Sequence, residues 1–208
     1  MSDIQLVKEF FKNKQFPNWL FEHSVNAAAV VAMIENSEDD ILDNKLIIGA
    51  LLHDTGRIFT NVGSKHTIAG YRILSEHESR CARFCITHSF PTQNANDYQG
   101  ENNCDSNEIS FMNQILSTIT LDDKKVILSD CYSTVQGVVT LNERFSDFDR
   151  RFPTQSANEI EMRNIIRRAY YEIENEIVCY FGIDISSQQG KFSFVEKRKL
   201  ILKSIEQL

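Results

Sequence analysis

The chain has 208 residues, of which 42% are hydrophobic, so it is long enough to bury a sizeable core within one domain. Its formal net charge is −7 and its Lys and Arg residues are interspersed with acidic ones, which argues against a nucleic acid polymer as a partner. No stretch approaches the roughly 18 apolar residues that a membrane helix needs, so we expect no membrane association either.

The cysteines and the first residues of the chain indicate a cellular location. Five cysteines, an odd number without a paired framework, are typical of reduced thiols in a cytosol. Residues 1–4 contain no basic region of the kind that begins a secretory signal. We therefore expect a soluble, cytoplasmic protein.

Apolar residues recur at helical spacing along the chain, while strict alternation over four or more residues is almost absent. This pattern predicts an all-α protein. Pro17 suits the first turn of a helix, and Ser64 suits a helix cap. The expected helices, in chain order, cover residues 3–11, 17–36, 37–53, a short segment after Ser64, 80–88, 109–119, 122–138, 158–181 and 194–206.

The segment 90–107 differs from its surroundings, because Pro, Gln, Asn, Asp and Gly dominate it. This composition predicts a long surface loop. Since the segment begins close after His88, we expect it to border the functional site. Two roles stay open at this point: a mobile lid, or a flexible insertion without a role.

We expect a single domain over residues 1–208, with a core at about 16–134 and the C-terminal helices of 135–208 packing on it. The C-terminal third shows no pattern that indicates chemistry of its own. Aromatic residues in the 158–181 helix pack that helix or a second subunit, so a homodimer is one arrangement to consider.

The dipeptide His53-Asp54 ends the apolar segment 46–52, and an imidazole beside a carboxylate suits a divalent metal ion. Neighbouring residues on a helix point about 100° apart, so both side chains reach one ion only at a helix end, and Gly56 permits that departure. His23 and Asp130 complete a set of two neutral nitrogens and two anionic oxygens. Such a set suits manganese, iron, cobalt, nickel, zinc or magnesium in differing degree.

The order His23, His53-Asp54, Asp130 resembles the signature of the HD superfamily of metal-dependent phosphohydrolases. The resemblance spans roughly residues 16–134. Its most specific part is the block Gly-Ala-Leu-Leu-His-Asp-Thr-Gly-Arg at 49–57. The segment from His66 to Gly70 is similar to a His-x-x-x-Gly segment of small members, and His88 to the histidine that ends the following helix. Many relatives have a second histidine there, where this chain has Ser89.

The resemblance implies a role for each of these residues. His23, His53, Asp54 and Asp130 are expected to bind the first metal ion, and Asp54 is also expected to act catalytically, close to the attacking water. His66 and His88 either hold a second ion or face phosphate oxygens as donors, and the second role is slightly preferred. The expected substrate-binding residues are Arg57 and, more weakly, Lys65.

We therefore expect a phosphohydrolase that cleaves an ester or anhydride of a nucleotide or another small phosphorylated metabolite with metal-bound hydroxide. One alternative is an HD-fold oxygenase with a dinuclear iron centre, which needs both His66 and His88 on the second iron. Another is a catalytically silent metal-binding regulatory module. The sequence does not choose the substrate or the metal, and it leaves one or two ions open.

Overall fold

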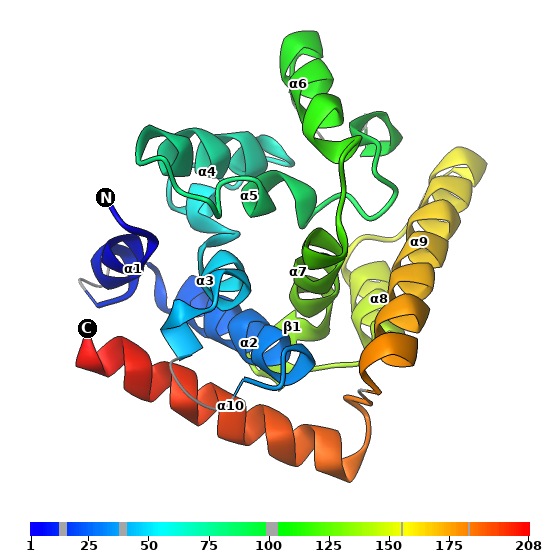
Figure 1. Ribbon diagram of the computed structural model, residues 1–208. Helices are drawn as coiled ribbons and strands as arrows, with labels where there is room; N and C mark the ends of the chain where they lie inside the picture. Colours follow the sequence, from blue (N-terminus) through cyan, green and yellow to red (C-terminus); the bar gives the residue numbers. More distant parts are fainter. Residues whose placement is uncertain (13–15, 38–40, 99–103, 155, 183) are drawn as a thin grey trace.

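The computed structural model describes residues 1–12, 16–37, 41–98, 104–154, 156–182 and 184–208 (Figure 1). These residues are mostly helical, with one two-stranded antiparallel hairpin, so the all-α prediction is confirmed. The helices are α1 (Asp3–Val7), α2 (Asn18–Ile34), α3 (Lys45–Leu52), α4 (Lys65–Glu76), α5 (Phe84–Thr87), α6 (Ser106–Leu116), α7 (Leu121–Tyr132), α8 (Leu141–Arg151), α9 (Ala157–Phe181) and α10 (Gln188–Gln207). The strands are β1 (Ser133–Thr134) and β2 (Gly137–Val138), and short helical turns are η1 (Lys8–Lys12), η2 (Ile41–Asp43), η3 (Thr55–Ile58) and η4 (Ala95–Tyr98).

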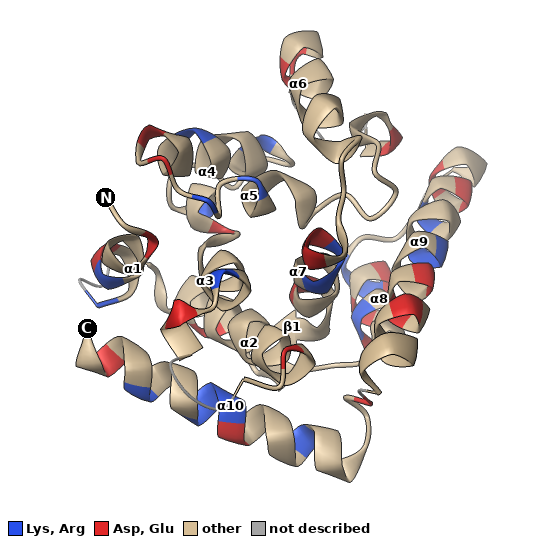
Figure 2. Ribbon diagram, viewed as in Figure 1, with Lys and Arg blue, Asp and Glu red and all other residues tan. Residues whose placement is uncertain are grey.

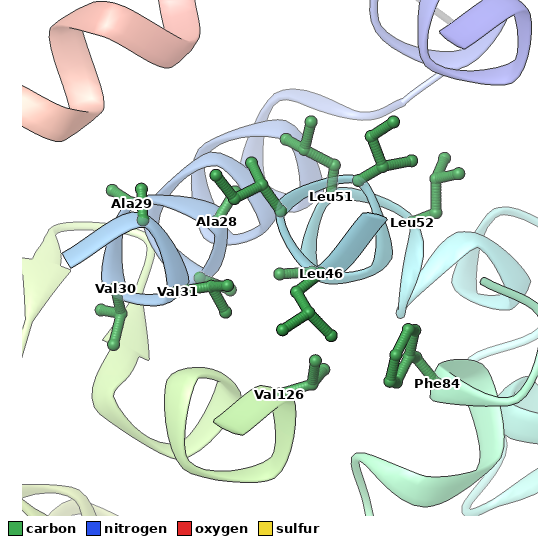
Figure 3. Packing of buried hydrophobic residues seen from close by; sticks show 14 of the residues in the cluster. Ala28, Ala29, Val30, Val31, Leu46, Leu51, Leu52, Phe84 and Val126 are labelled. Carbon is green, nitrogen blue, oxygen red and sulfur yellow. The ribbon is translucent and has the colours of Figure 1, made fainter. Parts of the chain in front are cut away.

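Helices α2, α3 and α7 form the centre of the core. Every residue of α2 from His23 to Ile34 is buried, because small side chains let the neighbouring helices approach from several sides. Figure 3 shows Leu46 of α3 lying between α2 and Val126 of α7. Gly49 admits Phe84 of α5 against α3, since a Cβ there would lie 2.4 Å from the ring. This packing brings the histidine-bearing helix α2 and the end of α3 close to α7.

The outer helices cover this centre from different sides (Figure 1). Helix α10 lies along α2, buries Ile201 and Ile205, and holds α2 through Arg198, whose Nη2 lies 2.5 Å from Glu22 Oε2. Helices α4, α5 and α6 enclose a second, smaller apolar cluster around Phe90 and Met112. Within the described ranges, no helix is both long and apolar enough to span a bilayer. The single-domain organisation over residues 1–208 stays a prediction.

Several helix boundaries differ from the prediction. Helix α3 begins at Lys45 and not at Ser37, because Asn44 caps it by accepting a hydrogen bond from the Leu46 backbone N–H; residues 38–40 lie outside the described residues. Helix α7 ends at Tyr132 and not at residue 138, because the next residues form the β1–β2 hairpin. Helix α5 is shorter than the predicted 80–88, and α10 begins six residues before the predicted start at Phe194.

The segment 90–107 is not a long surface loop over its described part. Phe90 is fully buried, and Ala95, the first residue of the turn η4, is buried as well. Asp105 caps α6, whose first residue is Ser106. Residues 99–103 lie outside the described part, so the prediction of a lid is not tested there.

Helix α8 was not predicted. Thr140 and Glu143 form a capping box at its start: the Glu143 carboxylate accepts hydrogen bonds from the Thr140 N–H and hydroxyl, and the Thr140 hydroxyl accepts from the Glu143 N–H. Only Leu141 of this helix is buried. Helix α8 therefore lies on the surface, against α7 and α9 (Figure 1).

Candidate metal centre

Four predicted ligands from three segments meet at one point. His23 comes from α2, His53 and Asp54 follow the last residue of α3, and Asp130 comes from the last turn of α7. One nitrogen or oxygen atom from each lies within 4.8 Å of the others. Asp130 Oδ1 lies 2.9 Å from His23 Nε2 and 3.4 Å from His53 Nε2. These distances place the four donor atoms around a space of the size of one cation.

A second group lies beside the first and shares Asp54 with it. His66 of α4 and His88, directly after α5, place their Nε2 atoms 3.4 and 3.3 Å from Asp54 Oδ1. The other carboxylate oxygen, Oδ2, faces the first group and lies 3.6 Å from both His23 Nε2 and His53 Nε2. The two oxygens of Asp54 thus face two neighbouring clusters.

Three of the histidines are held in the same way. The Nδ1–H groups of His53, His66 and His88 donate to the backbone carbonyls of Ala50, Gly63 and Phe84 at 2.7, 2.8 and 2.9 Å. Since Nδ1 carries a proton in each ring, Nε2 presents its lone pair to the clusters once the ring is neutral. Burial by itself would lower the pKa of His53, but the charge of Asp54 and the contacts with Asp130 outweigh burial and raise the pKa when no ion is bound. Such carbonyl contacts orient metal-binding imidazoles in proteins.

Two observations indicate that this set of donors fits a divalent cation. Asp54 Oδ1 is buried and has no hydrogen-bond partner among the described residues, which is costly for a carboxylate oxygen. In addition, the Nε2 atoms of His23 and His53 lie 3.3 Å apart, and those of His66 and His88 lie 3.4 Å apart. Paired lone pairs and an unpartnered anionic oxygen are both satisfied when a cation lies among them.

The charge state of the site follows from its surroundings. Burial by itself would raise the pKa of Asp54, but the positive charges of Arg57 and His53 outweigh it and hold the pKa well below its usual value. Burial also opposes ionisation of Asp130, and hydrogen bonds from His23 and His53 keep its pKa low. Burial lowers the pKa of His66 to about 3. Both carboxylates are therefore anionic and His66 is neutral, as metal binding requires.

The local backbone explains how the adjacent residues His53 and Asp54 can both face the same cluster. Helix α3 ends at Leu52, and Asp54 leaves helical geometry with φ −103° and ψ 14° before η3 begins. Gly56 in η3 then packs directly against α4, since a Cβ at Gly56 would lie 1.9 Å from the carbonyl oxygen of His66. This close approach brings His66 to the opposite side of Asp54.

An open cavity of about 810 Å³ borders the first cluster. His23, Asp54 and Asp130 line it, and so does Arg57, whose Nε donates to Asp54 Oδ2 at 2.7 Å. His66 and His88 are buried and do not line this cavity. Lys65 is exposed and does not line it either.

The cavity also has walls that the sequence analysis missed. Trp19, one helical turn before His23 on α2, lines it, as do residues of the hairpin and of α8. We expected the C-terminal third to contribute no chemistry of its own. In the structure, however, α8 supplies Arg144, Arg150 and Arg151 to the wall of this cavity. The Thr-x-x-Glu capping box at 140–143 is the sequence signal that could have revealed this helix.

Histidines and aspartates gathered between the helices of an all-α fold define a candidate metal site. Comparison with family models is consistent with such a site: residues 20–112 match the model described as HD domain, so this part of the chain is similar to HD domains. Asp130 and α8 lie beyond the matched residues. Comparisons with curated proteins and with solved structures found no match.

Proposed function

We propose that the protein is a metal-dependent phosphohydrolase that acts on a nucleotide or another small phosphorylated metabolite. The observation that carries the proposal is the pair of His/Asp clusters joined by Asp54, beside an open cavity of about 810 Å³. The HD domain belongs to a superfamily of metal-dependent hydrolases, which supports the same reaction class.

His23, His53, Asp54 and Asp130 would hold the first ion. A bound divalent ion lowers the pKa of water toward neutrality and offsets charge on phosphoryl oxygens. Asp54 is placed to orient the attacking water, because its two oxygens face both clusters. Arg57, held by Asp54, lines the cavity and keeps part of its guanidinium available to a phosphoryl oxygen, since the side chain is 30% exposed.

For His66 and His88 the geometry favours a second ion over a donor role. Their Nδ1–H groups already donate to backbone carbonyls, so a neutral ring offers only a lone pair at Nε2. The Ser89 hydroxyl donates to His88 Nε2 at 2.8 Å and occupies that lone pair when no ion is bound. The metal stays open among manganese, iron, cobalt, nickel, zinc and magnesium.

The same second cluster supports one other candidate function, an oxygenase with two iron ions. It would need His66 and His88 on the second iron. Metal content and visible absorbance after purification with iron distinguish the two candidates, because a dinuclear iron centre absorbs in the visible range and a manganese or magnesium site does not.

The experiment that tests the phosphohydrolase is a screen of phosphorylated metabolites against protein loaded with each of these metals. The variant Asp54→Ala removes the residue shared by both clusters and should lower the rate by at least about 1000-fold. Asp122→Ala changes a half-exposed carboxylate on α7 outside both clusters and serves as the matched control with an unchanged rate. Hydrolysis by Asp54→Ala at the parental rate would contradict the proposal.

We also propose a cellular location and a class of partner for the protein. The five cysteines are free, which supports a reducing, cytoplasmic location. A small soluble phosphate compound is the proposed partner, since the chain is acidic overall. A homodimer stays a prediction that the mass of the protein in solution would test.

A further inference from the structure

The cavity beside the metal centre is larger than a single phosphoryl group needs. Its volume of about 810 Å³ lies within the range of roughly 300–1,000 Å³ that is typical of pockets for whole small molecules. One wall carries the first cluster and Arg57, and another is formed by α8. In the proposed function the phosphoryl group that reacts would bind at the first wall. The second wall would then face the rest of the substrate.

The charged residues of this cavity are evenly matched. Four arginines and four acidic side chains line it, and two of the acids are the ligands Asp54 and Asp130. A divalent ion on those two carboxylates would leave the cavity with a net positive charge. Figure 2 shows basic and acidic positions close together along α8. An arginine that already forms an ion pair has less positive charge to offer to a ligand, so the partners of each arginine must be compared.

Arg144 differs from the other arginines of the wall. Arg150 and Arg151 both form ion pairs with Asp147, at 2.5 and 2.8 Å. Glu143, next to Arg144, is occupied by the cap of α8. The guanidinium of Arg144 forms no ion pair with any described residue, although the side chain is only half-exposed.

Arg144 also lines the cavity that borders the first cluster, together with His23, Asp54 and Asp130. The hydrogen bond from Arg150 and the charges of Arg151 and Arg144 hold the pKa of Asp147 below its usual value, so this one carboxylate faces three arginines. An anionic ligand in the cavity would offset the positive charge that remains.

We propose that Arg144 binds a second anionic group of the substrate, distinct from the phosphoryl group that reacts. This inference rests on the proposed function for the reacting group, and it narrows the substrate to compounds that carry at least two anionic groups, such as a second phosphate. Arg57 serves the reacting group, and Arg144 selects for the distal one. Because α8 lies outside the HD-matched residues, this selectivity belongs to this chain's own C-terminal part.

The test compares inorganic phosphate with pyrophosphate as ligands of the metal-loaded protein in excess Mg²⁺, with affinities from titration calorimetry. The parent should bind pyrophosphate at least about tenfold more tightly than phosphate. Arg144→Gln should weaken pyrophosphate binding about tenfold and change phosphate binding less than twofold. Arg168→Gln removes the same charge from an exposed position of α9 outside the cavity and should preserve the preference. Arg144→Lys keeps the charge without the planar fork and should give an intermediate affinity.

The single tryptophan of the chain provides a second readout. Trp19 lines the cavity, so pyrophosphate bound there should change its fluorescence at the concentrations found by calorimetry. Equal weakening in Arg144→Gln and Arg168→Gln, no weakening in Arg144→Gln, binding without a change in Trp19 emission, or no binding by the parent would each overturn the inference. Circular dichroism verifies folding, and Arg144→Lys carries the test if Arg144→Gln does not fold.

The two proposals can fail separately. If pyrophosphate binding depends on Arg144 but no phosphate compound is hydrolysed, the proposed function fails and the anion site stands. If hydrolysis depends on Asp54 and no ligand depends on Arg144, the proposed function stands and the inference fails.

Discussion

At the scale of the residue, Asp123 joins the two segments that carry His88 and Asp130. Its fully buried carboxylate accepts hydrogen bonds from Arg83 Nε and Nη2, both at 2.9 Å, and from the Thr87 hydroxyl at 3.1 Å. It also caps α7 through Thr120. One carboxylate thus fixes the turn before His88 relative to the helix of Asp130.

We expect Asp123→Ala to lower the free energy of unfolding by about 3–5 kcal/mol, because it leaves Arg83 without its partner in a largely buried network. Urea unfolding followed by circular dichroism measures this loss. Asp122→Ala, one residue away, breaks an ion pair with the exposed Lys45 and a longer one with Lys125, which keeps Glu35 as its partner at 2.6 Å, and should cost about 1 kcal/mol. Similar losses in the two variants would show that the network of Asp123 does not stabilise the fold.

The residues gathered at the site could be predicted to a large extent from the sequence. His23, His53, Asp54 and Asp130 meet as expected, since each lies at a helix end or on a helix whose buried face the apolar pattern defines. Trp19 and Arg144 could not be predicted in this way. They reach the cavity only through the packing of α2 and α8, and neither belongs to a local motif.

At the scale of the element, η3 and α4 are pressed together at Gly56. A Cβ at this position would lie 1.9 Å from the His66 carbonyl oxygen and 2.5 Å from the Gly70 nitrogen, both backbone atoms that cannot move independently. The contact fixes the start of α4, and so the position of His66, against the end of α3.

We expect Gly56→Ala to lower the free energy of unfolding by at least about 3 kcal/mol, because η3 and α4 must separate to admit a methyl group. The midpoint of thermal or urea unfolding measures the change. Gly182→Ala is the matched control: nothing lies within 4 Å of its Cβ, and only its φ of 64° opposes alanine, at about 1 kcal/mol. If both variants lost the same free energy of unfolding, the close packing at Gly56 would not contribute to the stability of the fold.

Elements with a strong apolar period were predicted well, and their ends were not. The 158–181 prediction agrees with α9 within one residue, because a long amphipathic pattern identifies its helix. The start of α3 was misplaced because the acidic run at 37–40 also reads as a helix start, whereas Asn44 forms the cap. The end of α7 depends on pairing between Ser133 and Val138, and a single-residue pattern does not reveal such pairing.

At the scale of the whole molecule, the metal centre connects segments that are far apart in the chain. The ligands of the first cluster come from α2, the end of α3 and α7, all of which belong to the main core. An ion bound by all of them ties these helices together in the folded state only, so its binding free energy adds to the stability of the fold.

We expect a divalent ion at about 100 times its Kd to add about 2.7 kcal/mol of stability, which corresponds to a rise in Tm of roughly 5–10 °C for a chain of this size. Thermal unfolding with Mn²⁺ and then with excess chelator measures the rise and its reversal. His53→Ala should abolish the rise. His77→Ala changes the one histidine that belongs to neither cluster and should retain it; a full rise in His53→Ala would contradict metal binding at this centre.

Because α8 lies on the surface, its sequence can change between related chains more freely than the sequence of the core helices. This helix buries only Leu141, while the two clusters lie in the densely packed interior. Substitutions at the exposed positions of 141–151 therefore cost little folding energy, whereas changes around His53 disturb the core. Evolution can accordingly retune which compound is accepted through this one exposed helix and leave the reactive chemistry as inherited.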